Sequence, residues 1–301
     1  MQRILLTGAS GQIGQALRRQ LIPWLSAADQ LYCPTRAEFD LSHPRQMQTW
    51  LDRYQPTLII NAAAYTAVDQ AEQERTLANQ INHLAVQQLA DWAALNHARL
   101  LHYSTDYVFD GNRPLDTAYL ETDPTAPLNV YGQTKQAGEQ AILQAGCRAW
   151  ILRTSWVYAD QGRNFINTIL QLAQQRESLS IVSDQIGAPN HAERIADYTL
   201  SILTECAVDL PTGIYHLSAS GQTSWYGLAQ YVLQIAERAE SLRCGVAGLK
   251  AITSADYPTA AQRPHNSQLC TQNIQQYIQL DLPHWSVDVE QMLKRRYERS
   301  N

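Results

Sequence analysis

The sequence predicts an α/β fold: a doubly wound parallel sheet with a smaller mixed α/β region toward the C-terminus. Short continuous apolar runs alternate with helical patterns through the first half of the 301 residues. Such runs are typical of parallel strands that are buried on both faces. A glycine-rich turn separates the first apolar run from the first helical pattern. No internal repeat or linker-like stretch interrupts the sequence, so we expect the second region to pack beside the sheet.

Five apolar runs are expected to be strands. They lie at residues 3–8, 31–35, 56–64, 98–105 and 148–156. Helical patterns follow at residues 11–25, 45–54, 77–96 and 131–146, in the alternation that a parallel sheet covered by helices requires. After residue 156 the pattern is less regular. Helices are expected there at 224–239, with Ser224 as the N-cap, and near 287–297.

Composition excludes several classes of protein. The sequence is 45% hydrophobic and 17% charged, which is an ordinary globular composition. Its net charge of −5 gives no basic surface for nucleic acid. No apolar run approaches the roughly 18 residues of a membrane span, and the first run is explained by a strand rather than a signal peptide. The five cysteines are scattered without a CxxC pair, which fits a reducing, cytoplasmic location.

Three glycines mark a nucleotide-binding turn. Gly8, Gly11 and Gly14 form G-x-x-G-x-x-G between the first strand and the first helix. Glycines there let the backbone approach a diphosphate and let the helix pack closely, and the helix N-terminus then faces the anion. A tight turn without a ligand is the alternative. We predict a Rossmann-type NAD(P)-binding domain at residues 1–157 and a mainly substrate-binding region at 158–301, some segments of which return to the sheet.

The end of the second strand predicts the preferred cofactor. Sites that prefer NAD usually place an acid there to hold the adenosine ribose, whereas this strand ends at Thr35 and Arg36. A hydroxyl and a guanidinium suit the 2′-phosphate of NADPH better, with NADH also usable. A solvated surface arginine is an equal alternative for Arg36. Asp40 and Leu41 are placed to flank the adenine, although Asp40 is as well placed to cap the next segment.

Tyr131 and Lys135 share one helix face because they are four residues apart. A carbonyl reductase needs an acid to protonate the oxygen that becomes negative, and a phenol pKa of roughly 10 is too high for efficient transfer. A nearby ammonium lowers that pKa. An isolated Y-x-x-x-K match is more often a surface pair, but this one follows a nucleotide turn. Thr105 ends a strand at the carboxyl edge of the sheet, where ligands bind, and is expected to donate to the same oxygen.

Seven segments, in order from residue 5 to about residue 269, carry a resemblance to a known family. They are "LLTGASGQIG", "NAAAYTAVDQAE", "YSTDYVFDG", "YGQTK", "RTSWVY", "DQIGAP" and "RPHNSQL". The sequence resembles the dTDP-4-dehydrorhamnose reductases, a family of extended short-chain dehydrogenases/reductases, and the second and third segments are specific to that family. The resemblance implies NADPH-dependent reduction of the 4-keto group of dTDP-4-dehydro-6-deoxy-L-mannose to dTDP-L-rhamnose, for polysaccharide biosynthesis.

The resemblance also implies roles for individual residues. Thr105, Tyr131 and Lys135 match the catalytic triad. Together with the turn, the expected cofactor contacts are Gly8, Gly11, Gln12, Ile13, Gly14, Arg36, Asp40, Leu41, Ala63, Ala64, Tyr65, Tyr131 and Lys135. The expected substrate contacts are Thr66, Val68, Asp69, Thr105, Trp156, Asn164, Gln185 and Arg263. A core aromatic, a helix cap and a surface charge are the alternatives for Trp156, Asp69 and Arg263.

The sequence departs from the family pattern at two positions. Family members often have His where this sequence has Tyr65, and Thr where it has Asn190. Both changes leave the triad intact but bear on substrate packing. Some members use magnesium ions at a subunit interface through glutamates, so the resemblance implies a homodimer and a magnesium role. No acidic cluster in the sequence identifies a metal site.

Other functions remain as alternatives. Dehydratases of the superfamily carry an Asp-Glu pair after the threonine, whereas Asp106 is followed here by Tyr107. Epimerases keep NAD bound through the cycle, so an isolated sample would contain it. A non-catalytic, NADP-binding relative such as the regulatory subunit of methionine adenosyltransferase would bind a partner protein without turnover. The intact Thr, Tyr and Lys set favours an enzyme whose partner is a nucleotide sugar, with no nucleic acid or membrane partner.

Overall fold

The computed structural model describes residues 1–205, 210–239, 242–279 and 282–298. Its main feature is a six-stranded parallel sheet of order β10-β5-β4-β3-β1-β2. The predicted α/β, doubly wound fold is confirmed. The strands are β1 (Arg3–Thr7), β2 (Gln30–Tyr32), β3 (Leu58–Asn61), β4 (Arg99–Thr105), β5 (Arg148–Thr154) and β10 (Gly213–His216).

Helices cover both faces of this sheet, and alternate strand residues point to each. Ile4 and Leu6 of β1 lie in one buried cluster, whereas Leu5 between them lies in another, as the two-residue period of a strand requires. The first cluster includes residues of α1 (Gln12–Trp24), α8 (Ala192–Glu205) and α10 (Gln272–Gln275). The second includes α2 (Pro44–Tyr54), α5 (Ala85–Leu95) and α6 (Val130–Ala145).

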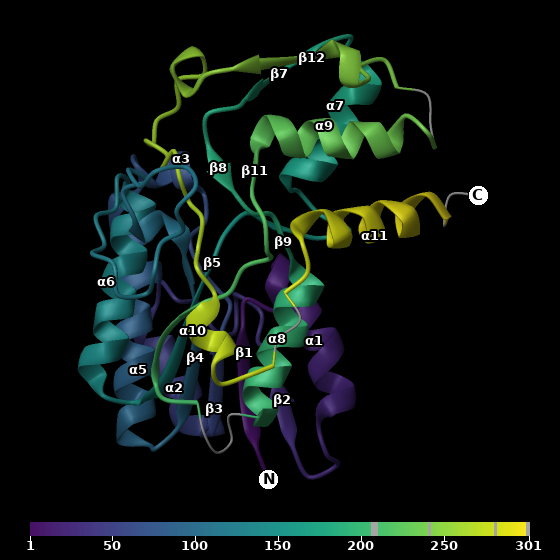
Figure 1. Ribbon diagram of the computed structural model, residues 1–301. Coiled ribbons are helices and arrows are strands. Elements are labelled where there is room, and N and C mark those ends of the chain that lie inside the picture. Colours follow the sequence, from purple (N-terminus) through teal and green to yellow (C-terminus); the bar gives the residue numbers. More distant parts are fainter. Residues whose placement is uncertain (206–209, 240–241, 280–281, 299–301) are drawn as a thin grey trace.

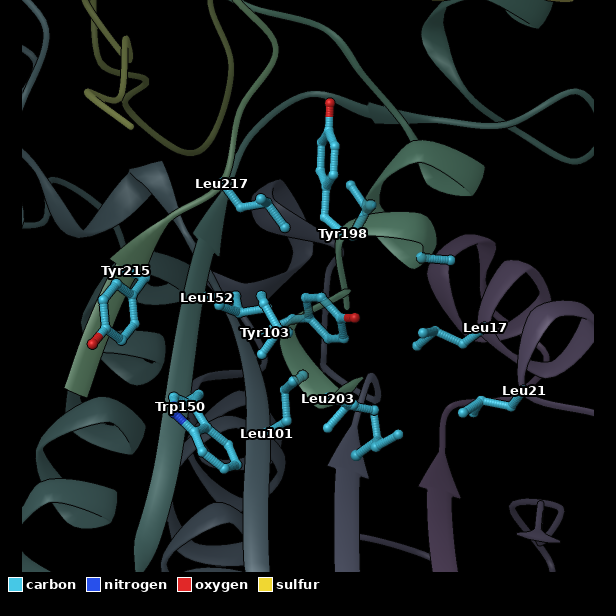
Figure 2. Close-up of a cluster of buried hydrophobic side chains, with 14 of the residues drawn as sticks. Leu17, Leu21, Leu101, Tyr103, Trp150, Leu152, Tyr198, Leu203, Tyr215 and Leu217 are labelled. Atoms are coloured by element: carbon cyan, nitrogen blue, oxygen red, sulfur yellow. The ribbon is translucent and has the colours of Figure 1, made fainter. Parts of the chain in front are cut away.

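Figure 2 shows the first cluster from inside. Leu17 and Leu21 of α1 point toward the strands, with Leu203 of α8 between them and Leu101 and Tyr103 of β4. The Tyr103 hydroxyl is buried and bonds Thr199 Oγ1 at 2.5 Å, because a buried phenol needs a partner. Helix α8 is therefore fixed to the middle of the sheet by a polar contact as well as by apolar packing.

The helix expected at residues 77–96 contains a π-helical turn. It runs as α4 (Arg75–Asn79), η1 (Gln80–Leu84) and α5. Within η1, Asn82 accepts a hydrogen bond from Tyr65 N at 2.8 Å and donates to Tyr65 O at 3.1 Å and to Thr134 Oγ1 at 3.1 Å. Such turns are frequent at functional sites. This one connects the loop after β3 to α6.

A second layer lies above the carboxyl ends of the strands (Figure 1). Its helices are α7 (Phe165–Gln175), α9 (Trp225–Ala236) and α11 (Trp285–Glu298), which share a buried cluster. As predicted, Ser224 caps α9, and its Oγ accepts from Gly227 N at 2.9 Å. Short strand pairs flank these helices: β6 (Val157–Tyr158) with β9 (Asn190–His191), β7 (Leu179–Val182) with β12 (Leu249–Ile252), and β8 (Ile186–Gly187) with β11 (Thr223–Ser224).

The chain passes between the two layers more than once. Helix α8 and strand β10 follow residue 157 in the sequence but belong to the sheet layer. The division at residue 157 stays a prediction. Cys33, Cys147, Cys244 and Cys270 are free, and Cys206 lies outside the described residues. Across the described ranges, no helix has the length and apolar character that crossing a membrane would need.

Candidate active site

The glycine turn is so closely packed that a Cβ does not fit at Gly8 or Gly14. Gly8 has φ +67°, and its carbonyl accepts from Gly11 N at 2.9 Å. A Cβ on Gly14 would lie 2.0 Å from Gly8 O, which no packing can accept. Gly11 is the N-cap of α1 and makes no side-chain cap bond, so the first amides of the helix are available to an anion. The turn therefore fits the diphosphate of a dinucleotide.

A cavity of about 880 Å³ begins at this turn and extends over the ends of β1, β3, β4 and β5. Ligand sites of doubly wound sheets lie at this edge. Most of the predicted contacts line it: Gly8, Gly11, Gln12, Ile13, Arg36, Asp40, Leu41, Ala63, Ala64, Thr66, Val68, Thr105, Tyr131, Lys135, Trp156 and Asn164. Gly14, Tyr65, Asp69, Gln185 and Arg263 are not among its lining residues.

Helix α6 carries Tyr131 and Lys135 to the cavity, and β4 carries Thr105. Asn129 starts α6 by accepting a hydrogen bond from Gly132 N at 2.8 Å, so Tyr131 stands in the first turn. Gly132 is required there because a Cβ would lie 2.2 Å from Tyr107 O. The structure thus brings the three predicted residues to one cavity.

The Lys135 ammonium is buried and bonded to β4. It donates to Tyr103 O at 2.6 Å and lies 3.0 Å from His102 Nε2. On the other side of the ring, Asn61 contacts His102 Nδ1 at 2.9 Å. Burial lowers the pKa of Lys135 to about 8, partly opposed by Glu139, and burial holds the pKa of His102 well below its usual range. Lys135 is therefore mainly protonated at pH 7 and His102 is neutral.

The lowering of the Tyr131 pKa that was expected from Lys135 stays a prediction, because Lys135 is not among the groups that shift this pKa here. Burial raises the pKa of Tyr131 to about 12, opposed by Thr105 and assisted by the Asp106 carboxyl. The main physical reason for the raised pKa is burial of the phenol, which disfavours its charged form. Tyr131 accordingly keeps its proton at neutral pH, as the acid of a reduction must.

At the adenine end, Arg36 forms an ion pair with an acidic side chain, and the sequence did not predict this contact. Its Nε lies 3.3 Å from Asp40 Oδ2. Burial tends to raise the pKa of Asp40, but bonds from Ser42 and the Arg36 guanidinium outweigh it and leave the pKa below its ordinary value. Asp40 also accepts from Ser42 N at 2.8 Å, so it orders the turn before α2. Apart from this contact, the Arg36 side chain is largely exposed.

Two tryptophans meet at the other end. Trp156 follows β5 with φ +44°, a conformation that is rare for a bulky side chain. Its ring stacks on that of Trp225 from α9, with centroids 3.6 Å apart and planes 9° apart. Both rings line the cavity. Gln185 accepts from Trp225 Nε1 at 3.2 Å, so it holds this pair from behind rather than lining the cavity.

The remaining predicted residues make hydrogen bonds or ion pairs with neighbouring groups of the protein. Asn164 caps α7, accepting from Asn167 N at 3.0 Å. Asp69 pairs with Arg263, with Oδ2 and Nη2 2.7 Å apart. Tyr65 donates to Glu74 Oε2 at 2.8 Å. Their roles toward a substrate stay predictions.

Asn190, the second departure from the family pattern, is buried in a hydrogen-bond network. Its Nδ2 donates to Ser155 O and to Ala188 O, both at 2.8 Å, and its Oδ1 accepts from Ala219 N at 2.6 Å. The side chain therefore supports the segment that carries Trp156.

Sequence reasoning missed Trp225, Arg18 and Arg163, which also line the cavity. Trp225 opens the predicted helix at 224–239, so an aromatic residue directly after an N-cap was the available signal. Arg18 and Arg163 gave no signal, because lone arginines are usually solvated. No group of three or more His, Cys, Asp or Glu in the described ranges could hold a metal ion, and magnesium dependence stays untested.

The fold and this cavity place the protein among the extended short-chain dehydrogenases/reductases. The chain belongs to the family described as RmlD substrate binding domain, whose model matches residues 1–298. It is 45% identical to dTDP-4-dehydrorhamnose reductase of Escherichia coli (strain K12), over 98% of both chains.

Two solved structures share the whole fold. One is dTDP-4-dehydrorhamnose reductase of Bacillus anthracis in complex with NADP, with TM-score 0.85 and 32% identity over 100% of this chain and 99% of that one. The other is a dTDP-4-dehydrorhamnose reductase from Clostridium acetobutylicum, with TM-score 0.88 and 28% identity over 98% and 99%.

Proposed function

We propose that the protein reduces the 4-keto group of dTDP-4-dehydro-6-deoxy-L-mannose with NADPH and releases dTDP-L-rhamnose. One observation carries the proposal: a single cavity joins the glycine turn to Thr105, Tyr131 and Lys135. Relatives that match along nearly the full chain are reductases of this sugar nucleotide, and one related structure holds NADP. NADH is expected to serve as a weaker reductant.

Three residues of the chain have different roles in the proposed reduction. Bound NADPH supplies the hydride. Tyr131 gives its proton to the C4 oxygen as charge develops there, and Thr105 hydrogen-bonds the same oxygen. An ammonium has three donors. One of those on Lys135 is used by Tyr103 O, and the ammonium also lies 3.0 Å from His102 Nε2. A further donor is left for the nicotinamide ribose or the Tyr131 oxygen, so Lys135 has both an electrostatic and a positioning role.

The two aromatic rings support the sugar assignment. A 6-deoxyhexose has an apolar face formed by its methyl group and C–H bonds. The rims of Trp156 and Trp225 offer an apolar surface at the cavity end. Asp69 and Arg263 pair with each other and do not line the cavity, and we propose that they contact the nucleotide half after exchanging their mutual ion pair for substrate groups.

The alternatives lack equivalent support. Elimination by a dehydratase needs an Asp-Glu pair after the threonine, and Tyr107 occupies the Glu position. A non-catalytic NADP-binding subunit would not need Tyr131 and Lys135 in the cavity beside Thr105. We further propose a cytoplasmic location and a homodimer. Light scattering of the purified protein would test the homodimer, and fractionation of cells would test the location.

The test is direct. Purified protein is incubated with NADPH and the 4-keto sugar nucleotide, and nicotinamide absorbance and product stereochemistry are followed. The expected result is stoichiometric oxidation of NADPH with formation of dTDP-L-rhamnose. NADPH binding without oxidation would favour the regulatory subunit, and tightly bound NAD in the isolated protein would favour an epimerase.

A further inference from the structure

We propose that Asp106 is a positioning residue that sets the direction of the Thr105 hydrogen bond. With Asp106 neutral, Thr105 donates its proton to the substrate oxygen; with Asp106 ionised, that proton is held by the carboxylate. This inference rests on the proposed reduction and adds a proton-dependent control to it.

The geometry around the Thr105 hydroxyl carries the proposal. Its Oγ1 donates to Asp106 Oδ1 at 2.9 Å and accepts from Tyr107 N at 3.2 Å. A hydroxyl has one proton and two lone pairs. Once those two bonds are made, only a lone pair of Oγ1 remains for the cavity and for the neighbouring Tyr131 hydroxyl, whose pKa Thr105 affects. A lone pair repels a carbonyl oxygen that is becoming negative, so Thr105 in this arrangement opposes the reduction that it is expected to assist.

One proton on Asp106 reverses this arrangement. A neutral carboxyl group has an O–H donor of its own, and across the same 2.9 Å it can donate to Thr105 Oγ1. The Tyr107 amide keeps its bond to the other lone pair. The Thr105 proton is then free to turn toward the cavity, where Tyr131 also lies. The two residues together present two donors to one oxygen.

The surroundings of Asp106 favour the neutral form. The residue is 3% exposed, and Oδ2 has no hydrogen-bond partner among the described residues. A buried carboxylate with one unpaired oxygen is unfavourable. Burial raises the pKa of Asp106 to about 7, against the opposing effect of the Thr105 and Ser267 hydroxyls. Both forms of Asp106 are therefore present near neutral pH.

The charged and titratable groups described around Asp106 are either neutral at pH 7 or already bonded to other groups. Burial raises the pKa values of Tyr107 and Tyr131, so both phenols are neutral at pH 7. Arg263 tends to lower the pKa of Tyr107. Its guanidinium is paired with Asp69, and the Nη2 and Oδ2 atoms are 2.7 Å apart. Lys135 on α6 is bonded to Tyr103 O and His102.

The two forms of Asp106 determine how kcat should change with pH. Below about pH 7 Asp106 is neutral and Thr105 is a donor, so kcat falls as pH rises through about 7. Lys135 also loses its proton as pH rises, with a pKa of about 8, so the wild-type profile alone does not separate the two groups. Asp106→Asn does, because its amide is neutral at every pH of the profile and leaves Lys135 as the titrating group.

The experiment compares pH profiles of kcat at saturating NADPH and sugar nucleotide. In Asp106→Asn the falling limb should move up by roughly one pH unit, toward the pKa of Lys135. Asp116→Asn, which removes an exposed carboxylate, should leave the limb in place. In a Thr105→Val background, Asp106→Asn should no longer move it. Absence of wild-type turnover would overturn the proposed function, whereas an active Asp106→Asn protein with an unmoved limb overturns only this inference.

A second measurement needs neither substrate nor a mutation of Asp106. Carbon-13 NMR of aspartate-labelled protein should show a carboxyl that titrates near pH 7. In Thr105→Val that titration should move to higher pH, since the Thr105 bond stabilises the carboxylate. A spectrum in which Thr105→Val moves no titration in this range shows that the two groups are not coupled and refutes the proposal.

Discussion

The two ends of the cavity are built from different parts of the polypeptide. The diphosphate end consists of backbone from one continuous stretch, Gly8 to Gly14, which leaves no room for a Cβ at Gly8 or Gly14. The sugar end consists of side chains from separate segments, including Trp156 after β5 and Trp225 on α9. A backbone site can be identified in the sequence from its spacing, whereas a side-chain site depends on how distant segments meet. The two ends should therefore respond differently to substitution.

The largest effect is expected at Tyr131, where the two ends meet. General acid catalysis typically contributes ~10²–10⁴-fold, so Tyr131→Phe should lower kcat by about that factor, with NADPH affinity retained. Single-turnover kinetics and fluorescence titration with NADPH measure the two quantities. A folded Tyr131→Phe protein with near-normal turnover would mean that another group is the acid.

Gly14→Ala should damage the backbone end severely. Its Cβ would lie 2.0 Å from Gly8 O, whereas a Cβ on Gly11 would lie at 3.3 Å. Because overpacking costs about 1–3 kcal/mol or more, Gly14→Ala should lower Tm and weaken NADPH binding by roughly tenfold or more. Gly11→Ala is the matched control and should have a clearly smaller effect. Equal effects of the two substitutions would contradict the close contact between turn and helix.

Trp225→Ala should affect the sugar end of the cavity and leave the diphosphate end unchanged. It removes the ring that stacks on Trp156, and an aromatic contact contributes about 0.5–1.5 kcal/mol beyond its buried area. We expect the KM for the sugar nucleotide to rise by roughly tenfold while the KM for NADPH is unchanged. Trp24→Ala, at the far end of α1, is the control for loss of a tryptophan. If both KM values rose together with a large fall in Tm, the pair would be a structural feature.

The smallest effect is expected at Arg36. Arg36→Ala should raise the KM for NADPH by roughly fivefold and leave that for NADH nearly unchanged, as the loss of an exposed charge contact of about 1 kcal/mol implies. The substitution also leaves Asp40 without its guanidinium neighbour, and a carboxylate there repels a 2′-phosphate. Arg45→Ala, on the exposed side of α2, is the control. A wild-type protein that prefers NADH would refute the assignment.

The parts predicted correctly from the sequence depend on local spacing. The buried strands and their helices follow from apolar runs, and the glycine turn and the Tyr131–Lys135 pair follow from intervals of three and four residues. The π-helical turn in the long helix was not predicted, because it depends on the contacts that Asn82 makes with Tyr65 and Thr134. Those contacts join residues far apart in the sequence.

Electrostatics was the least predictable part of the candidate site. The spacing of Tyr131 and Lys135 suggested a lowered phenol pKa, yet burial raises it to about 12. The outcome depends on how deeply the fold buries the phenol, which the spacing of two residues on a helix does not indicate. The direction of the Thr105 hydrogen bond likewise depends on a neighbouring carboxyl group whose burial only the fold determines.

The repeated passage of the chain between its two layers has a consequence for engineering. A fragment ending at residue 157 would have β5 as an open sheet edge, because β10 is its neighbour in the whole chain. It would also lack α8, which packs over Tyr103 and α1. Such edges and apolar surfaces promote aggregation. A chimera that borrows sugar specificity from a relative must therefore exchange several separate stretches of the second layer and keep α8 and β10 from the original chain.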